Sequence, residues 1–390
     1  MIRAFTAFTG EIDDGETAVA EIMDQLGGCE GLSKNSIGFL TCYSEFVDSG
    51  VMKEICDALP FDVIGSTTLG NAVRGSAGRM LLTLMVITSD EAEFSIGLTE
   101  PLSDGDAGAL RAAYEEAASR ITGKPALMVS FAPLLLSVSG DFYVNSFADI
   151  SGGVPNFGML AVDSNDDFRD SQVISRGEAY RDRYAFALFG GGVTPRFFIS
   201  SISSEKVFME KGVVTSADGN RVHAVNDKPA VEYLEGLGLK KNADGTIASV
   251  TSFPFVVDYN DGSFPVVRVI FSIAPDGSAV CGGDIPMGAT VSVGHVDCDE
   301  VLATTTEAVS DAMLSGEAGC AFMFSCAARY LALGYETMSE QEKVQNLMEG
   351  VSTPYLFSYS GGELCPVPSG GDSAVLVNRN HNETFIMCLL

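Results

Sequence analysis

A short stretch near the C-terminus combines side chains that could bind a small anion. Ser325 and Cys326 follow the apolar run 321–324, and helix-forming residues then continue as far as Gly334. This pattern predicts a buried strand that turns directly into a helix ending at the glycine. The positive end of the helix dipole, with Arg329 about one turn further on, suits binding of a carboxylate or another small anion.

Cys326 at the start of this predicted helix permits two interpretations. A helix N-terminus lowers the pKa of a thiol, so Cys326 could be a nucleophile, but a free cysteine also commonly fills a tight buried corner. A hydrolase triad would combine Cys326 with His381 and Asn382. Adjacent residues of a strand point to opposite faces, which disfavours that triad. A cysteine-dependent hydrolase is therefore an alternative and not the main prediction.

Two later segments contribute further polar residues. Glu363 follows two glycines in a predicted turn, where it could hold a ligand ammonium or be solvated. Arg329 could clamp a ligand carboxylate through two parallel hydrogen bonds or pair with Glu363. Asn382 and Thr384 share one face of the last predicted strand and could bind a ligand or satisfy a neighbouring loop.

These segments resemble the ordered signature of the FIST C-terminal domain, which has S-C-x-x-R, then Y-x-G-E-I/L-x-P, then H-N-x-T. The chain has Ser325-Cys-Ala-Ala-Arg329, then Tyr359-Ser-Gly-Gly-Glu363-Leu-Cys-Pro366 with one added glycine, then His381-Asn-Glu-Thr384. The first half resembles the FIST N-terminal domain through Ile64-Gly-Ser-Thr-Thr-Leu-Gly-Asn71. The family pattern there is I-G-C-S-T-x-G-E, so Ser66 replaces the cysteine and Asn71 the glutamate.

The resemblance implies a sensory module that is not an enzyme and binds small ligands such as amino acids. It places the ligand site at Ser325, Cys326, Arg329, Gly362, Glu363, Asn382 and Thr384, with Ser66, Thr67 and Thr68 contributed by the other domain. The chain carries no kinase, cyclase or receptor segment, so we expect it to act through a separate signalling protein such as a histidine kinase. The resemblance further implies a bacterial signal-transduction protein.

Some relatives in this family bind haem and report nitric oxide, which leaves a haem-binding sensor as a second alternative. The chain has three histidines, His223, His295 and His381, and none lies in a C-x-x-C-H motif. No cofactor is therefore the main expectation. We also expect no metal, because there is no H-E-x-x-H motif and the acidic segment Ser164–Asp167, a predicted turn, lacks EF-hand spacing.

The order of predicted elements indicates a mixed fold. Helical and strand periodicities alternate over residues 1–131, which predicts an α/β sheet covered by helices. Short strands between residues 156 and 202 indicate an antiparallel meander, and the mixture returns after residue 228. The expected fold is α/β to α+β, with two mixed-sheet domains at 1–218 and 219–390 and helices packed on the sheets. A ligand cleft is expected where the domains face each other.

Charge and cysteine content restrict the partners and the compartment. The formal net charge is −29, so nucleic acids and anionic membrane surfaces would repel the protein. The sequence contains neither a signal-peptide core nor an apolar run long enough to span a bilayer. Nine cysteines occur without a C-x-x-C pair, which favours free thiols in a reducing cytoplasm.

Overall fold

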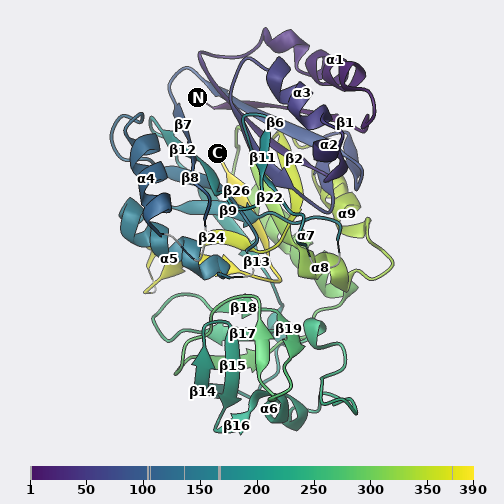
Figure 1. The fold of residues 1–390 in the computed structure, drawn as a ribbon, viewed down its shortest axis with the longest axis vertical. Coiled ribbons are helices and arrows are strands. Elements are labelled where there is room, and N and C mark those ends of the chain that lie inside the picture. The colour runs from purple at the N-terminus through teal and green to yellow at the C-terminus, as the bar shows by residue number, and fades with distance from the viewer. Residues whose placement is uncertain (1, 103–104, 106, 136, 166–167, 371) are drawn as a thin grey trace.

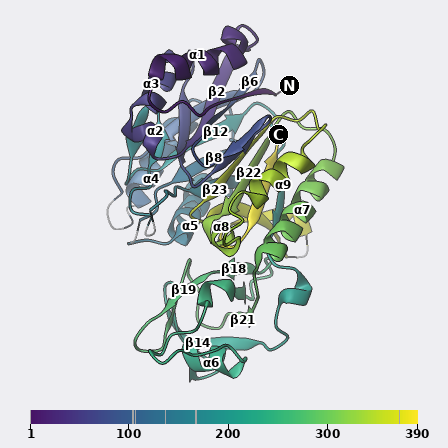
Figure 2. The ribbon, with the colours of Figure 1, turned by 90° about the vertical axis from the view of Figure 1, so that its right-hand side faces the viewer.

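The computed structural model of the chain describes residues 2–102, 105, 107–135, 137–165, 168–370 and 372–390. It confirms the predicted mixed α/β class with helices packed on sheets. A larger body and a smaller lobe are visible in two perpendicular views (Figures 1 and 2). Among the described helices, none is long and apolar enough to cross a membrane. The predicted turn at 164–167 includes Asp166 and Asp167, which lie outside the described residues.

The body consists of three repeats of one order of elements: strand, helix, strand, helix, strand, hairpin, strand. The first repeat has β1 (Arg3–Thr9), α1 (Gly15–Gln25), β2 (Asn35–Cys42), α2 (Glu45–Asp48) with α3 (Val51–Ala58), β3 (Val63–Thr67), the hairpin β4 (Asn71–Val73) and β5 (Ser76–Gly78), and β6 (Leu82–Ser89). The second has β7 (Glu93–Leu98), α4 (Ala107–Ala118), β8 (Leu127–Ala132), α5 (Gly140–Ser151), β9 (Asn156–Leu160), the hairpin β10 (Val173–Ser175) and β11 (Glu178–Tyr180), and β12 (Ala185–Gly190). The third has β13 (Arg196–Ser200), α7 (Cys298–Leu314), β22 (Ala321–Cys326), α8 (Ala327–Ala332) with α9 (Ser339–Leu347), β23 (Tyr355–Ser360), the hairpin β24 (Glu363–Ser369) and β25 (Asp372–His381), and β26 (Phe385–Leu389).

The three repeats are interlocked by an exchange of hairpins. Each sheet contains four strands of its own repeat and the hairpin of another repeat, in the orders β1-β6-β2-β3-β10-β11, β7-β12-β8-β9-β24-β25 and β13-β26-β22-β23-β4-β5. In every sheet the two central strands of the repeat are parallel, namely β2 with β3, β8 with β9, and β22 with β23. Their crossovers are the helices that cover the sheets, as parallel connections require. The first repeat therefore pairs directly with the last.

The sheets enclose a shared aromatic core. Phe39 of β2 packs edge-on against Phe322 of β22, with 4.8 Å between ring centroids, and Phe131 of β8 contacts Phe324 of β22. Both faces of these strands are buried, because one face meets this core and the other meets the helices. Such strands are continuously apolar, as is the run that precedes Ser325.

The lobe is an insertion in the third repeat, between β13 and α7. It contains α6 (Ala230–Gly236) and the strands β14 (Gly212–Asp218), β15 (Arg221–Val225), β16 (Lys228–Pro229), β17 (Phe255–Asp258), β18 (Val266–Arg268), β19 (Ile270–Ile273), β20 (Ala279–Cys281) and β21 (Thr290–Val293). The strands form one antiparallel sheet with a separate apolar core. Figure 1 places the lobe below the body, beneath β13, β24 and α5.

The join predicted near Asp218 falls at the turn between β14 and β15, inside the lobe. As a division into domains 1–218 and 219–390 it stays a prediction. The described sheets combine strands from both sides of this position, since β4 pairs with β23 and β9 pairs with β24.

Candidate functional site

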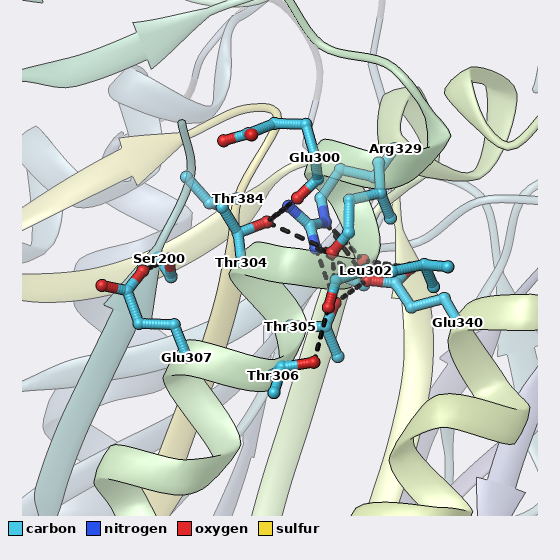
Figure 3. A network of polar contacts seen from close by, with 12 residues as sticks. Ser200, Glu300, Leu302, Thr304, Thr305, Thr306, Glu307, Arg329, Glu340 and Thr384 are labelled. Carbon is cyan, nitrogen blue, oxygen red and sulfur yellow. Dashed lines mark hydrogen bonds and ion pairs between the residues drawn. The ribbon is translucent and has the colours of Figure 1, made fainter. Parts of the chain in front are cut away.

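The predicted strand-to-helix corner is present, and its arginine is enclosed by protein groups. Arg329 and its ion-pair partner Glu340 of α9 are both fully buried, with 2.8 Å between the Nη2 and Oε1 atoms. The remaining Arg329 hydrogen bonds go to Ser325, Thr304, Thr305 and the Val301 carbonyl oxygen. Figure 3 shows this network between α7, α8 and α9. The pairing of Arg329 is therefore with Glu340, and not with Glu363.

Glu363 is fully buried and accepts hydrogen bonds from two hydroxyl groups, those of Ser360 and Thr384. Burial raises the pKa of the Glu363 carboxyl to about 8, against the opposing effect of these hydroxyls. The sequence interpretation as a solvated turn residue is therefore wrong.

Cys326 lies beside this carboxyl and is not an activated thiol. Burial raises its pKa well above the ordinary value, and the neighbouring Glu363 and Glu383 carboxyls raise it further. His381 does not activate it, because the His381 Nε2 atom lies 3.0 Å from the Cys365 carbonyl oxygen. Burial also lowers the pKa of His381 to about 3. The Cys326–His381–Asn382 triad is therefore not formed, and the alternative of a cysteine hydrolase finds no support in this geometry.

Glu383 is a buried carboxyl that the sequence analysis did not select. It adopts a left-handed backbone conformation, with a φ of 56°, in the turn between β25 and β26. Its side chain is buried, and its Oε2 atom has no hydrogen-bond partner among the described residues. Burial raises its pKa to about 8. A strained backbone and an unpartnered buried carboxyl together are typical of functional positions.

The prediction that Asn382 and Thr384 lie on one face of a strand is also wrong. Residues 382–384 form this turn and are not part of a strand, so alternation does not decide where their side chains point. Asn382 donates to the His381 carbonyl oxygen, and its own side-chain oxygen has no partner among the residues described. Gly362 lies beside it, with a φ of 147°, and a Cβ atom there would come within 3.4 Å of the Asn382 amide nitrogen.

Ser66 and Thr67 end β3 and Thr68 follows it, and their side chains contact Met159, Gln172 and Tyr359. The Ser66 hydroxyl faces the sulfur of Met159 at 3.7 Å, and Thr67 pairs with Gln172. Thr68 donates to the Tyr359 carbonyl oxygen at 2.7 Å, which ties this segment to β23. The structure thus brings Ser325, Cys326, Arg329, Glu363 and Thr384 into one polar centre, with Gly362 and Asn382 at its edge. Ser66–Thr68 border it from the first repeat.

The three repeats differ in the polarity of the residues where their hairpins begin. The first hairpin residue of each repeat is Asn71, Val173 or Glu363. Asn71 joins Thr41, Thr83 and Ser358 in a buried hydroxyl network. The equivalent of Thr41 in the second repeat is Phe131, which pairs with Ala185. At the first hairpin position the residue is therefore polar in the first and third repeats and apolar in the second. At the position of Thr41, both other repeats have a phenylalanine, Phe131 and Phe324.

A groove of about 540 Å³ lies between the lobe and the body. The body contributes Asp141 of α5 and Arg379 of β25, and the lobe contributes Tyr259, Asp261 and Asp284. Arg379 pairs with Asp261 and lies over the Tyr259 ring, 4.9 Å from its centroid. A volume of this order suits a small ligand, and boundaries between structural units are common ligand sites.

Arg268 of β18 links the lobe to the body through Asp141, a residue that lines the groove. It is fully buried, and its Nη2 atom lies 2.7 Å from an Asp141 carboxylate oxygen. It also donates to the carbonyl oxygens of Asn380 and Asp284 and to the Tyr259 hydroxyl. A charged residue inside the apolar segment Val266–Ile273 is the sequence signal for this link, since a buried arginine requires a partner.

Asp284 remains without a cation. No ion pair within 4.0 Å is recorded for it in the described part of the chain. Burial raises the pKa of its carboxyl and the neighbouring Asp141 raises it further, while the Ser139 hydroxyl and the more distant Arg268 guanidinium lower it. Behind it, the fully buried Asn380 donates to Asp141, while the Asn380 side-chain oxygen has no partner among described groups.

The buried glutamates predict an unusual dependence of stability on pH. The pKa values of Glu363 and Glu383 are about 8 in the folded protein, whereas an unfolded glutamate titrates near about 4.3. Between these values the folded state keeps protons that the unfolded state has released, so stability falls as pH rises. We expect the free energy of unfolding to fall by up to about 1.4 kcal/mol per pH unit and per group.

Urea denaturation at several pH values between about 5 and 8 measures this slope. The Glu363→Gln variant should show a smaller slope than the wild-type protein. Glu205→Gln, at an exposed position, is the matched control and should leave the slope unchanged. A slope that is equal in Glu363→Gln and wild type would show that Glu363 is ionised in the folded state.

The residues present do not favour the haem alternative. The Nε2 atom of the buried His381 faces Cys365, so this nitrogen is not open to a haem iron. His295 stacks on the Phe253 ring at 5.0 Å, and His223 lies on β15 of the lobe. In the part of the chain described, no cluster of three or more His, Cys, Asp or Glu residues could hold a metal ion.

Comparison with known proteins gives a family and two solved structures. The FIST N domain model matches residues 36–228, and the FIST C domain model matches residues 230–366. No curated protein matches the chain. A cyanuric acid hydrolase structure aligns at 10% identity and a TM-score of 0.30, covering 76% of this chain and 99% of the other. The enzyme from A. caulinodans aligns at 12% identity and a TM-score of 0.35, covering 100% and 99%.

These matches overturn the prediction that the chain is not an enzyme, because both solved structures are of a hydrolase. At these TM-scores they indicate neither a reaction nor a substrate for this chain.

Proposed function

Because the chain belongs to the FIST family, whose domains are sensory domains of signal transduction, we propose that it senses a small polar metabolite. An amino acid is the first candidate. The proposed site is the groove between the lobe and the body, lined by Asp141, Tyr259, Asp261, Asp284 and Arg379. This replaces a cleft between residues 1–218 and 219–390 with one between the inserted lobe and the three repeats.

One observation carries this proposal: the groove presents an unpaired carboxyl group and an arginine on facing parts of the fold. Asp284 of the lobe has no cation within ion-pair distance among the described residues, and the Arg379 Nε atom has no hydrogen-bond partner there. A ligand ammonium would satisfy Asp284, and a ligand carboxylate would satisfy Arg379.

We propose that the predicted site residues form a buried extension of the groove. Asn382 lies beside Gly282, two residues before Asp284, and also beside Gly362, which directly precedes Glu363. Direct contact between a ligand and the polar centre, including a carboxylate clamp by Arg329 or a contribution from Ser66–Thr68, stays a prediction. It would require residues 380–384 to shift, because these side chains are buried.

We further propose that the signal is the position of the lobe, read by a separate signalling protein such as a histidine kinase. The site is divided between the lobe and the body, so a ligand that contacts both favours one arrangement over others. A bacterial cytoplasm is the proposed location. Its support is that all nine cysteines are free, including Cys320, Cys365 and Cys388, which lie near one another in the core.

Thermal shift and isothermal titration against the standard amino acids test the proposal. We expect one amino acid or a chemically related few to raise the melting temperature, because a ligand that binds only the folded state stabilises it. Arg379→Gln should abolish that shift, and Arg111→Gln, at an exposed helical position, should retain it. A protein that no amino acid stabilises, or a shift that survives in Arg379→Gln, contradicts the proposal.

A further inference from the structure

We infer that the groove between the lobe and the body selects amino acids whose side chains carry a positive charge. This inference rests on the proposed function, since it specifies the ligand class of the same groove. The selecting group is Asp284, supported by Asp141, and the ligand group it takes is an amine or a guanidine.

The charges around the groove do not balance. Asp141, Asp261 and Asp284 contribute three carboxyl groups, whereas Arg379 and Arg268 contribute two guanidinium groups. Arg268 is committed to Asp141, and Arg379 is committed to Asp261. Asp284 is therefore the carboxyl left over. A neutral zwitterion leaves this excess unchanged, and a ligand with one additional positive charge removes it.

The neighbours of Asp284 strengthen its demand for a cation. Its backbone N–H group donates to an Asp141 carboxylate oxygen at 2.9 Å, which places the two acidic residues side by side. Arg268 donates to that carboxylate with a nitrogen at 2.7 Å, and Asn380 donates to it with its amide. The Asn380 side-chain oxygen then remains as a buried acceptor without a partner among the described residues.

The apolar part of the groove fits the stem of such a side chain. Ile285, Pro286 and Met287 follow Asp284 directly along the lining. Met287 is 67% exposed, so its side chain is available to a ligand in the groove. Lysine and arginine cover apolar surface with their methylene groups while the charged end remains paired. A basic amino acid bound with its end group at Asp284 would lie along Met287.

Titration calorimetry with matched ligand pairs tests this inference. Arginine is compared with citrulline, which has nearly the same shape without the charge, and lysine with norleucine, which lacks the terminal ammonium group. We expect the charged member to bind about 10- to 100-fold more tightly, the value of a charge-assisted hydrogen bond to a partly buried carboxylate. Asp284→Asn should reduce the difference to less than about threefold, and the preference should also weaken at high salt. Asp24→Asn makes the same change at an exposed position of α1 and should leave the preference intact.

The outcomes separate the two proposals. Equal binding of arginine and citrulline by the wild-type protein, or an undiminished preference in Asp284→Asn, overturns the charge selection and leaves an amino-acid sensor in place. Absence of binding by every amino acid, charged or not, overturns the proposed function itself. A shift of the arginine preference in Asp284→Asn but not in Asp24→Asn supports both.

Discussion

Replacement of Arg329 by methionine is expected to lower the free energy of unfolding by about 3–5 kcal/mol. Arg329 is fully buried and neutralises the equally buried Glu340. Methionine fills much of the space, but it leaves the Glu340 carboxylate without a cation in a medium that solvates charge poorly. Urea denaturation followed by circular dichroism measures the change.

The double variant Arg329→Met with Glu340→Gln provides the control for this result. It removes both charges, so we expect it to be more stable than the single variant, because the main cost is the uncompensated carboxylate. Arg111→Met, which breaks an exposed pair with Glu115, should change stability by less than about 1 kcal/mol. If Arg329→Met unfolds like wild type but no longer binds its ligand, Arg329 is the carboxylate clamp that the sequence suggested.

The second large effect is expected at Arg268. Arg268→Met leaves Asp141 buried without its arginine and removes hydrogen bonds to Asn380, Asp284 and Tyr259. The expected loss is again about 3–5 kcal/mol. It should be localised, because the lobe has its own apolar core. Hydrogen–deuterium exchange should accelerate at the start of α5 and in β18 before the core strands of the repeats exchange.

Asp141→Asn combined with Arg268→Met tests this explanation, since the pair is removed without leaving a charge. We expect the double variant to recover part of the stability while exchange at the lobe boundary remains fast. Lys53→Met, at an exposed ion pair with Glu178, is the surface control. Exchange in Arg268→Met that matches wild type at α5 and β18 would mean that the lobe is held by apolar contacts instead.

Local patterns were sufficient to predict most elements of the fold. Residues 18–26 show helical spacing and end at two glycines, and α1 indeed precedes Gly27 and Gly28, which have positive φ angles. The short apolar run 37–42 lies within β2, and the segment 299–314, with apolar residues at helical spacing, lies within α7. These elements are set by side-chain periodicity and by glycine, both of which are visible in a short window.

The exchange of hairpins between repeats could not be predicted from short stretches of the sequence. Asn71 pairs with Ser358, and nothing near either residue specifies the partner. Helix α5 was also missed, because its aromatic residues Phe142, Tyr143 and Phe147 have modest helix propensity and its helical face appears only once it packs on β25. Tertiary contact decided both features.

The candidate site was likewise predictable only where the signal was local. The strand-to-helix corner at Cys326 was predicted from sequence, since an apolar run followed by helix formers is a local signal. The partner of Arg329 was not, because Glu340 arrives from a separate helix. The groove could not be predicted from the sequence, because its residues come from α5, β25 and three separate segments of the lobe. The one local signal was Arg268, a lone charge in an apolar strand, which indicates a buried partner.

A crystal structure of the protein grown with arginine would locate the proposed ligand site. We expect arginine in the groove between the lobe and the body, with its carboxylate at Arg379 and its guanidinium at Asp284, and with the Arg268–Asp141 pair intact. Arginine bound elsewhere, or an unfilled groove at a concentration that raises the melting temperature, would contradict this expectation.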